Sequence, residues 1–115
     1  MCEPDAETLR ARYLPRLLKE LEDLRESSTA TAEARRPVEL DQQSVGRLSR
    51  MDALQQQAMA AAQEARRLAH IRSVEAAIRR LNAGEFGWCD SCGEFIGEKR
   101  LGLDPTLMRC IGCAR

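Results

Sequence analysis

Residues 89–113 read CDSCGEFIGEKRLGLDPTLMRCIGC, a stretch that begins and ends with a Cys-x-x-Cys pair. The pairs are Cys89 with Cys92 and Cys110 with Cys113, and seventeen residues (93–109) separate them. Two intervening residues form a tight turn that directs both sulfurs at one ion, and the long separation lets the second pair complete a tetrahedron. Because four thiolates leave no open coordination position, we expect a structural metal site. The chemistry favours zinc, and the spacing alone leaves iron open.

Other interpretations of the cysteines are a redox pair or two disulfides. Both are disfavoured, because two pairs at this spacing occur here without the strand–helix–strand pattern of thioredoxin-like proteins. Cys2 lies close to the N-terminus and is interpreted as a bystander thiol.

His70 is the single histidine and precedes Cys89 by nineteen residues. Since four cysteines suffice for the ion, we expect His70 to be a surface or packing residue of a helix.

Residues from about 5 to 36 are predicted to form a first helix. Leucines recur there at spacings of three and four, which places them on one stripe of a helix. They are Leu14, Leu17, Leu21 and Leu24. Pro15 lies inside this stripe and is expected to kink the helix or delay its start. Pro37 is expected to end it.

A second helix is predicted from Asp41 or Ser44, either of which can cap it, to about Leu81. Asn82-Ala83-Gly84 marks its end, since glycine accepts the left-handed conformation of a helix C-cap. The expected apolar stripe consists of Leu54, Ala58, Ala61, Ala65, Leu68, Ile71, Val74, Ile78 and Leu81. The step from Leu68 to Ile71 breaks the alternation of three and four, which predicts local overwinding of a coiled coil.

These two helices can bury each other's stripes as an antiparallel hairpin. Ser28 and Thr31 are expected to face the alanines of the second helix, so the hairpin is predicted to be thick at its base and slender at its tip. A bundle of three or four helices would need apolar faces that the chain lacks. The predicted fold class is therefore mainly α. It consists of a long antiparallel helical hairpin (coiled coil) over residues 1–84 with its tip near 37–46, and a small four-cysteine zinc finger over 85–115 at its base.

The composition excludes several classes of protein. Hydrophobic residues make up 43% of the chain but aromatic residues only 3%, which suits a narrow helical seam better than a thick globular core. The 18 basic and 18 acidic side chains argue against binding to nucleic acid or membranes by bulk charge. The chain has no apolar run long enough to span a membrane and no secretory signal, so we expect a cytoplasmic protein. It shows no nucleophile–base set and no phosphate-binding glycine loop, so we do not expect an enzyme.

Basic residues gather toward the end of the second helix. This basic face consists of Arg66, Arg67, Arg72, Arg79 and Arg80 on the helix and is continued by Lys99, Arg100, Arg109 and Arg115. It would suit phosphate groups or an acidic protein surface. An equally good interpretation is structural, because a helix C-terminus favours cations and arginine stems cover apolar surface.

Four short motifs resemble the zinc finger of the DksA/TraR family. They are residues 85–93 (EFGWCDSCG), 96–101 (IGEKRL), 105–106 (PT) and 110–113 (CIGC). The resemblance implies a bacterial transcription regulator that binds RNA polymerase directly. In this family the hairpin enters the secondary channel of the polymerase and modulates promoter complexes, often together with ppGpp. It also implies one structural Zn²⁺ at the four cysteines and a monomer without membrane contact or sequence-specific DNA binding.

The chain departs from the family at the tip, where the best-known members carry Asp-x-x-Asp-x-Ala. The candidate tip residues here are Asp41, Ser44 and Asp52. Asp41 is the first choice, and capping of the second helix explains it equally well.

The positions linked to ppGpp in the family are only partly basic in this chain. Arg66 and Arg100 match, whereas Ser73, Asp104 and Ala114 stand where responsive members carry Lys or Arg. The response to ppGpp is therefore left open. Two further hypotheses are a zinc-ribbon and coiled-coil adaptor or nucleic-acid-binding protein, and a thiol redox switch.

Overall fold

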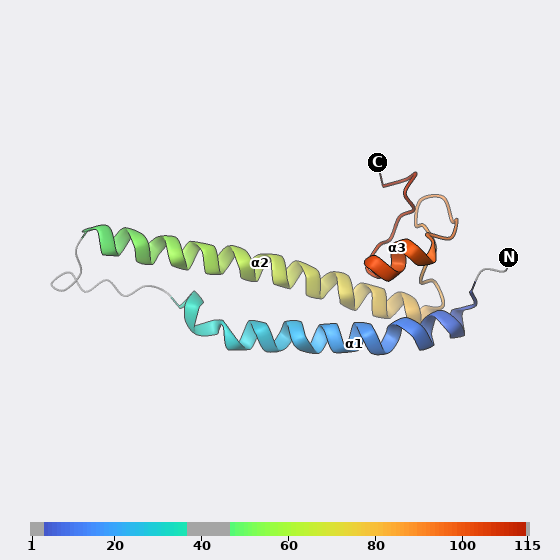
Figure 1. Cartoon of the computed structure of the whole chain (residues 1–115), viewed down its shortest axis with the longest axis horizontal. Coiled ribbons are helices and arrows are strands. Elements are labelled where there is room, and N and C mark those ends of the chain that lie inside the picture. Colours follow the sequence, from blue (N-terminus) through green and yellow to red (C-terminus); the bar gives the residue numbers. More distant parts are fainter. Residues whose placement is uncertain (1–3, 37–46, 115) are drawn as a thin grey trace.

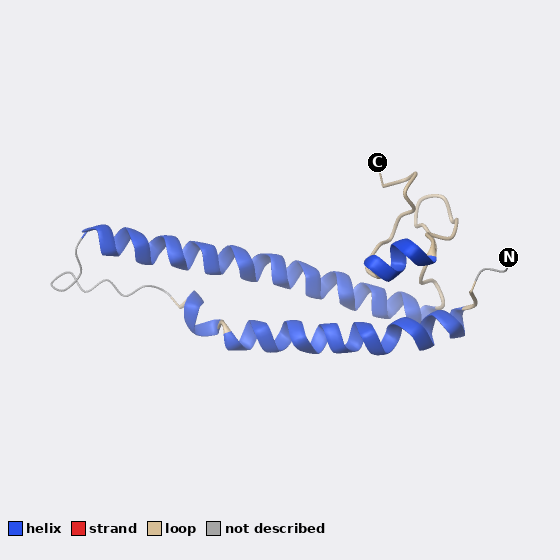
Figure 2. Ribbon diagram, viewed as in Figure 1, coloured by secondary structure: helices blue, strands red, loops and turns tan. Residues whose placement is uncertain are grey.

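The computed structural model describes residues 4–36 and 47–114 of the chain. Its elements are α1 (Ala6–Ala30), the 3-10 helix η1 (Ala32–Arg35), α2 (Arg47–Ala83) and α3 (Glu98–Leu103). Helices α1 and α2 lie side by side and antiparallel, and α3 with its loops sits at one end of the pair (Figures 1 and 2). The radius of gyration is 20.0 Å, against about 13 Å for a compact chain of this length. The predicted mainly α hairpin is confirmed.

Helix α1 begins where a side chain caps it. An Asp5 carboxylate oxygen accepts a hydrogen bond of 2.8 Å from the Thr8 amide, and this bond lowers the pKa of Asp5. The helix runs through Pro15, whose ring is exposed, so the expectation of a delayed start is wrong. It ends at Ala30, earlier than predicted, and the chain turns into η1.

One continuous apolar core joins the base of the hairpin to the cysteine-containing segment. Each of three parts of the chain contributes buried residues. They are Leu9, Tyr13, Leu17 and Leu21 from α1; Ile71, Val74, Ala77 and Leu81 from α2; and Phe86, Cys89, Ile96 and Leu101 from the C-terminal segment. The predicted stripes are therefore correct near the base.

The predicted stripe of α2 is wrong in its distal half. Leu54 and Leu68 are 47% and 43% exposed, and the stripe alanines Ala58, Ala61 and Ala65 are exposed as well. Counting back from Val74 and Ile71 in steps of three and four reaches Arg67 and Glu64, so the seam continues without the predicted break. These two residues, rather than the alanines, lie opposite the end of α1. The prediction failed because it followed hydrophobic residues, while the seam there is polar.

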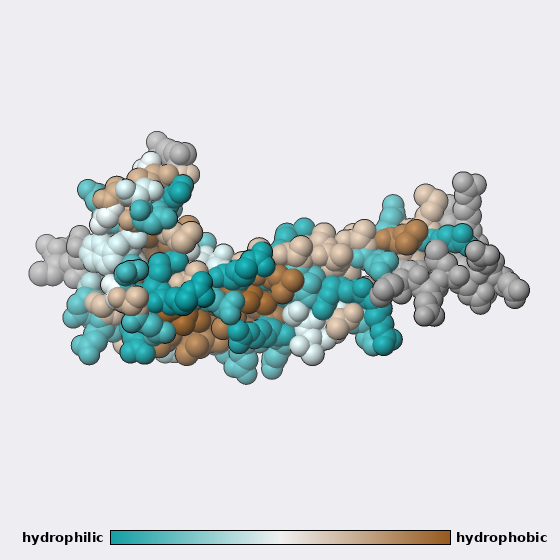
Figure 3. Space-filling view, turned by 180° about the vertical axis from the view of Figure 1, so that it is seen from behind, coloured by the Kyte–Doolittle hydropathy of each residue, from teal (hydrophilic) through white to brown (hydrophobic). Residues whose placement is uncertain are grey.

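Apolar side chains gather on the surface in two places. Figure 3 shows one patch over the two long helices beside the finger and a smaller one toward the far end of α2. Exposed residues of the distal half of α2 include Met51, Leu54 and Met59.

None of the helices described is both long and apolar enough to span a membrane.

Candidate metal centre

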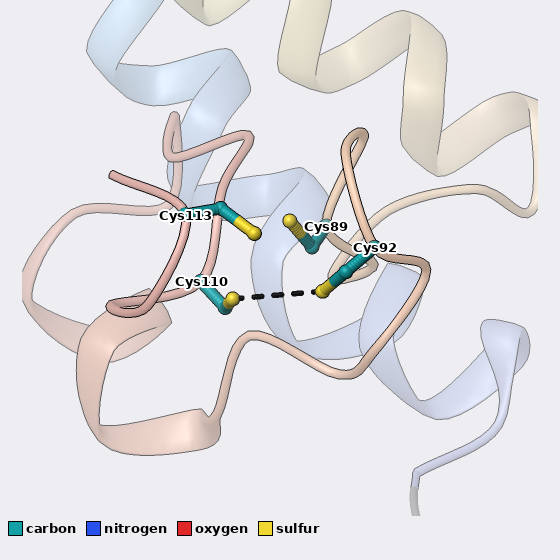
Figure 4. Close-up of side chains that lie close together, drawn as sticks. All are labelled: Cys89, Cys92, Cys110 and Cys113. Atoms are coloured by element: carbon teal, nitrogen blue, oxygen red, sulfur yellow. Dashed lines mark hydrogen bonds between the residues drawn. The ribbon is translucent and has the colours of Figure 1, made fainter. Parts of the chain in front are cut away.

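The first cysteine pair sits in a tight hairpin turn. Trp88 and Phe95 form an isolated antiparallel bridge, and their rings lie 5.4 Å apart between centroids. The Cys89 amide donates to the Glu94 carbonyl at 2.8 Å, and the Gly93 amide donates back to the Cys89 carbonyl at 2.9 Å. The turn places both sulfurs of the pair on one side of the backbone, where a single ion can reach them (Figure 4).

The second pair forms a similar turn, and a backbone bond joins the two turns. The Cys113 amide donates to the Cys110 carbonyl at 3.1 Å. The Asp90 amide donates to the Met108 carbonyl at 2.9 Å, and the Arg109 guanidinium lies 3.3 Å from the Asp90 carboxylate. These bonds bring the second pair of cysteines next to the first.

The four sulfurs converge on one point (Figure 4). The Sγ atoms of Cys89, Cys92, Cys110 and Cys113 all lie within 4.8 Å of one another. Cys92 Sγ and Cys110 Sγ are 3.6 Å apart, far beyond a disulfide bond of about 2.05 Å. A zinc ion with Zn–S bonds of about 2.3 Å in a tetrahedron requires S–S separations of about 3.8 Å. All four thiols are free, and their spacing fits one tetrahedral Zn²⁺.

The electrostatics of the cluster also favour a cation. Backbone hydrogen bonding, chiefly with Cys110, lowers the pKa of Cys89 to about 6. The neighbouring thiols, Cys110 first, raise the pKa of Cys113 to about 12. Four thiols so close together cannot all ionise without a compensating positive charge, and a bound Zn²⁺ supplies that charge. The donor set thus fits a zinc ion that holds structure.

Several contacts dock this module on the hairpin base. The Tyr13 and Phe86 rings lie 5.2 Å apart between centroids. Arg16 donates to the Gly102 carbonyl at 2.9 Å, and Arg12 pairs with Glu98 at 2.5 Å. The module is therefore held by α1 as well as by its covalent link to α2.

The other candidate residues do not gather at one site in the part of the chain that the structure describes. Asp41 and Ser44 lie outside the described residues, and Asp52 is exposed on α2. Arg66, Arg72 and Arg79 are also exposed on α2. Arg100 belongs to α3, is half-buried and donates to the Arg109 carbonyl at 3.4 Å. His70 Nε2 lies 2.6 Å from Glu20 Oε1, which makes it a contact between the two long helices.

Arg80, a member of the predicted basic face, links α2 to the finger. It donates to the Thr106 carbonyl at 3.4 Å, and burial lowers its pKa. With Arg72, Ser73 and Thr106 it lines a groove of about 230 Å³ between α2 and the module. No local pattern distinguishes Arg80 from its neighbour Arg79, because only the docked module makes one of them half-buried.

Gly87 is expected to contribute to stability where the finger docks on the hairpin. Its φ is +92°, and a Cβ there would lie 3.1 Å from the Phe95 ring and 3.4 Å from Leu9. We expect Gly87→Ala to destabilise the protein by about 1–3 kcal/mol in chemical denaturation of the zinc-loaded chain, because it adds backbone strain and a clash. The control is Gly102→Ala, where a Cβ meets nothing within 4 Å. Equal effects of the two substitutions would contradict this account.

Comparisons with known proteins agree with this geometry. Residues 84–115 match the model of the prokaryotic DksA/TraR C4-type zinc finger. The RNA polymerase-binding transcription factor DksA of Haemophilus influenzae is 44% identical over 43 residues, which cover 37% of this chain and 30% of that protein. Its counterpart from Escherichia coli K12 is 40% identical over 43 residues, 37% of this chain and 28% of that protein. The matched segment thus spans less than a third of either relative.

The similarity in fold extends further than the similarity in sequence. Transcription factor DksA2 from Pseudomonas aeruginosa superposes with a TM-score of 0.78 at 24% identity, covering 97% of this chain and 88% of that one. The fold and site define a class of proteins in which a long helical hairpin carries a four-cysteine zinc finger at its base. Within that class, residues 84–115 are similar to the DksA/TraR C4-type zinc finger, and the four clustered cysteines fit one structural Zn²⁺.

Proposed function

We propose that this protein is a non-enzymatic transcription regulator of the bacterial cytoplasm that binds RNA polymerase directly and inserts its hairpin into the secondary channel. The observation that carries the proposal is the DksA/TraR finger at the base of a rod with extents of 70 × 29 × 19 Å. A rod of these proportions suits a narrow channel. The relatives that share the finger are RNA polymerase-binding factors by name.

The distal part of α2 would enter the channel first. Asp52 is exposed there and stands as a proposed polymerase-facing residue together with Asp41 and Ser44. The finger and the base of α2 would rest on the channel rim, where exposed Arg66, Arg72 and Arg79 suit an acidic surface.

A response to ppGpp is not part of this proposal. Ser73 lines the groove between α2 and the finger with no basic group of its own. The Asp104 carboxylate accepts bonds from the Thr106 amide at 3.0 Å and from its hydroxyl at 2.6 Å, so this residue shapes a turn of the finger. Binding of polymerase is therefore proposed without dependence on ppGpp.

The experiment is direct binding of the zinc-loaded monomer to bacterial core RNA polymerase, measured by fluorescence anisotropy. We expect saturable binding that another secondary-channel protein displaces. No binding at concentrations on the order of tens of micromolar would overturn the proposal. Salt-sensitive binding to DNA alone, lost in an Arg66→Ala/Arg72→Ala/Arg79→Ala variant, would instead favour the nucleic-acid-binding alternative.

A further inference from the structure

A charged cluster interrupts the seam between the two long helices. Glu64 of α2 is only 8% exposed, and its carboxylate oxygens accept hydrogen bonds of 2.7 and 3.0 Å from the Ser28 hydroxyl. The Arg35 and Arg67 guanidinium groups lie 2.7 and 3.2 Å from the same carboxylate. The hydrogen bond from Ser28 is the largest cause that lowers the pKa of Glu64, and the two arginines lower it further. The carboxylate is therefore ionised at neutral pH.

The cluster joins three elements of the fold. Arg35 reaches it from η1 and also donates to the Thr31 hydroxyl at 2.8 Å and to the Ser28 carbonyl at 3.0 Å. The Ser28 carbonyl lies in the final turn of α1, where carbonyls lack the usual helical partner, and it also accepts a bond of 3.4 Å from the Thr31 hydroxyl. Arg35 therefore ties the end of α1 and η1 to α2 through Glu64.

The cluster lies at the distal limit of the buried seam. Leu21, Ile71 and Val74 fill the seam toward the base, whereas none of the side chains described between Arg50 and Gln63 is buried. Helix α2 continues from Glu64 to Arg47, a further length of about 25 Å. Figure 1 shows the chain turning toward α2 at η1, where α1 ends.

We propose that this cluster of Glu64, Arg35, Arg67, Ser28 and Thr31 is a clasp, which holds the last turn of α1 and η1 on α2 and opens as a unit while the base stays folded. An apolar contact at this position would expose hydrophobic surface on opening, whereas every group of the clasp can be hydrated when it opens. Elements held by few buried apolar contacts are those that open locally. The clasp therefore fixes the register of the hairpin and still permits reversible opening of residues 27–36. This inference is independent of the proposed function.

The test compares Glu64→Gln with Glu75→Gln by hydrogen exchange of the zinc-loaded full chain. Glu75 also pairs with α1, through Arg25 at 3.1 Å, but Arg25 is exposed and the Glu75 side chain is 37% exposed. We expect Glu64→Gln to accelerate exchange of residues 27–36 by about 10-fold or more, because two half-buried guanidinium groups lose their counter-charge. Exchange around Leu17 and Val74 should not change. The Glu75→Gln control should alter neither region.

Two outcomes would overturn the clasp. One is unchanged exchange of residues 27–36 in Glu64→Gln, and the other is equal acceleration along the whole hairpin, which would indicate general destabilisation. If Glu64→Gln does not fold, Arg35→Met is the second test variant. Arg35 lies outside the two long helices, so its replacement leaves both helices unchanged in sequence. It should accelerate exchange of residues 27–36 alone, and the absence of that change would also overturn the clasp.

Discussion

Replacement of Cys110 by serine is expected to abolish zinc binding and unfold the finger. The finger beyond α2 has about 30 residues and few buried side chains of its own, among them Phe86, Ile96 and Leu101. A segment of this size does not fold without a metal or another cross-link. Structural zinc contributes about 10–16 kcal/mol to such modules, and a hydroxyl does not replace a thiolate in the tetrahedron.

The loss of zinc should spread to the hairpin base because the two parts share one core. Phe86 and Leu101 cover Leu9 and Tyr13, so an unfolded finger uncovers these residues to water. The expected results are less than one-tenth of the wild-type zinc content by elemental analysis, a changed Trp88 fluorescence and a lower thermal midpoint of the helical signal. Chelation of zinc from the wild-type protein should reproduce them.

Ser91→Ala is the matched control for Cys110→Ser. Ser91 lies between two ligands but is exposed, and its hydroxyl contacts only Asp90 among the residues described. This variant should keep one zinc per chain and a wild-type thermal midpoint. If Cys110→Ser retained a full equivalent of zinc, the four-cysteine site would be wrong.

The finger could be predicted from the sequence because its chemistry is local. Two Cys-x-x-Cys pairs at this separation leave few alternatives, and the turns that hold them need only nearby backbone bonds. The helices and the apolar seam near the base were predictable for the same reason, since Leu17, Leu21 and Val74 follow a helical period. Such features depend on residues close together in the chain.

The polar seam could not be predicted because it depends on residues far apart in the chain. Glu64 is buried only because Ser28 and Arg35 reach it from about 30 residues away, and hydrophobic periodicity assigns any glutamate to the surface. Leu54 and Leu68 were wrongly placed in the seam because the same periodicity assigns hydrophobic residues to the buried side of a helix. The same limit explains why the partial burial of Arg80 was not predicted, since it depends on the docked finger, where Arg80 donates to the Thr106 carbonyl.

Leu17→Ala is expected to cause the largest loss of stability among substitutions in the hairpin. Leu17 is fully buried at 0% exposure, at the centre of the core between α1 and α2. Truncation of a buried leucine removes its transfer free energy and leaves a cavity, which together cost about 2–5 kcal/mol. Since domains of this size lose roughly 4–8 °C per kcal/mol, the thermal midpoint should fall by about 10 °C or more.

The neighbouring Leu18 separates this packing effect from any effect on helix formation. Its side chain is 49% exposed, so Leu18→Ala should shift the midpoint by only a few degrees, about 0.5 kcal/mol or less, while making the same chemical change in the same helix. Both variants are measured by thermal circular dichroism with saturating zinc, so that metal loss does not contribute. Equal shifts would mean that α1 does not present Leu17 to α2, and the register of the hairpin would be wrong. A large shift for Leu17 alone would establish that register independently of the finger.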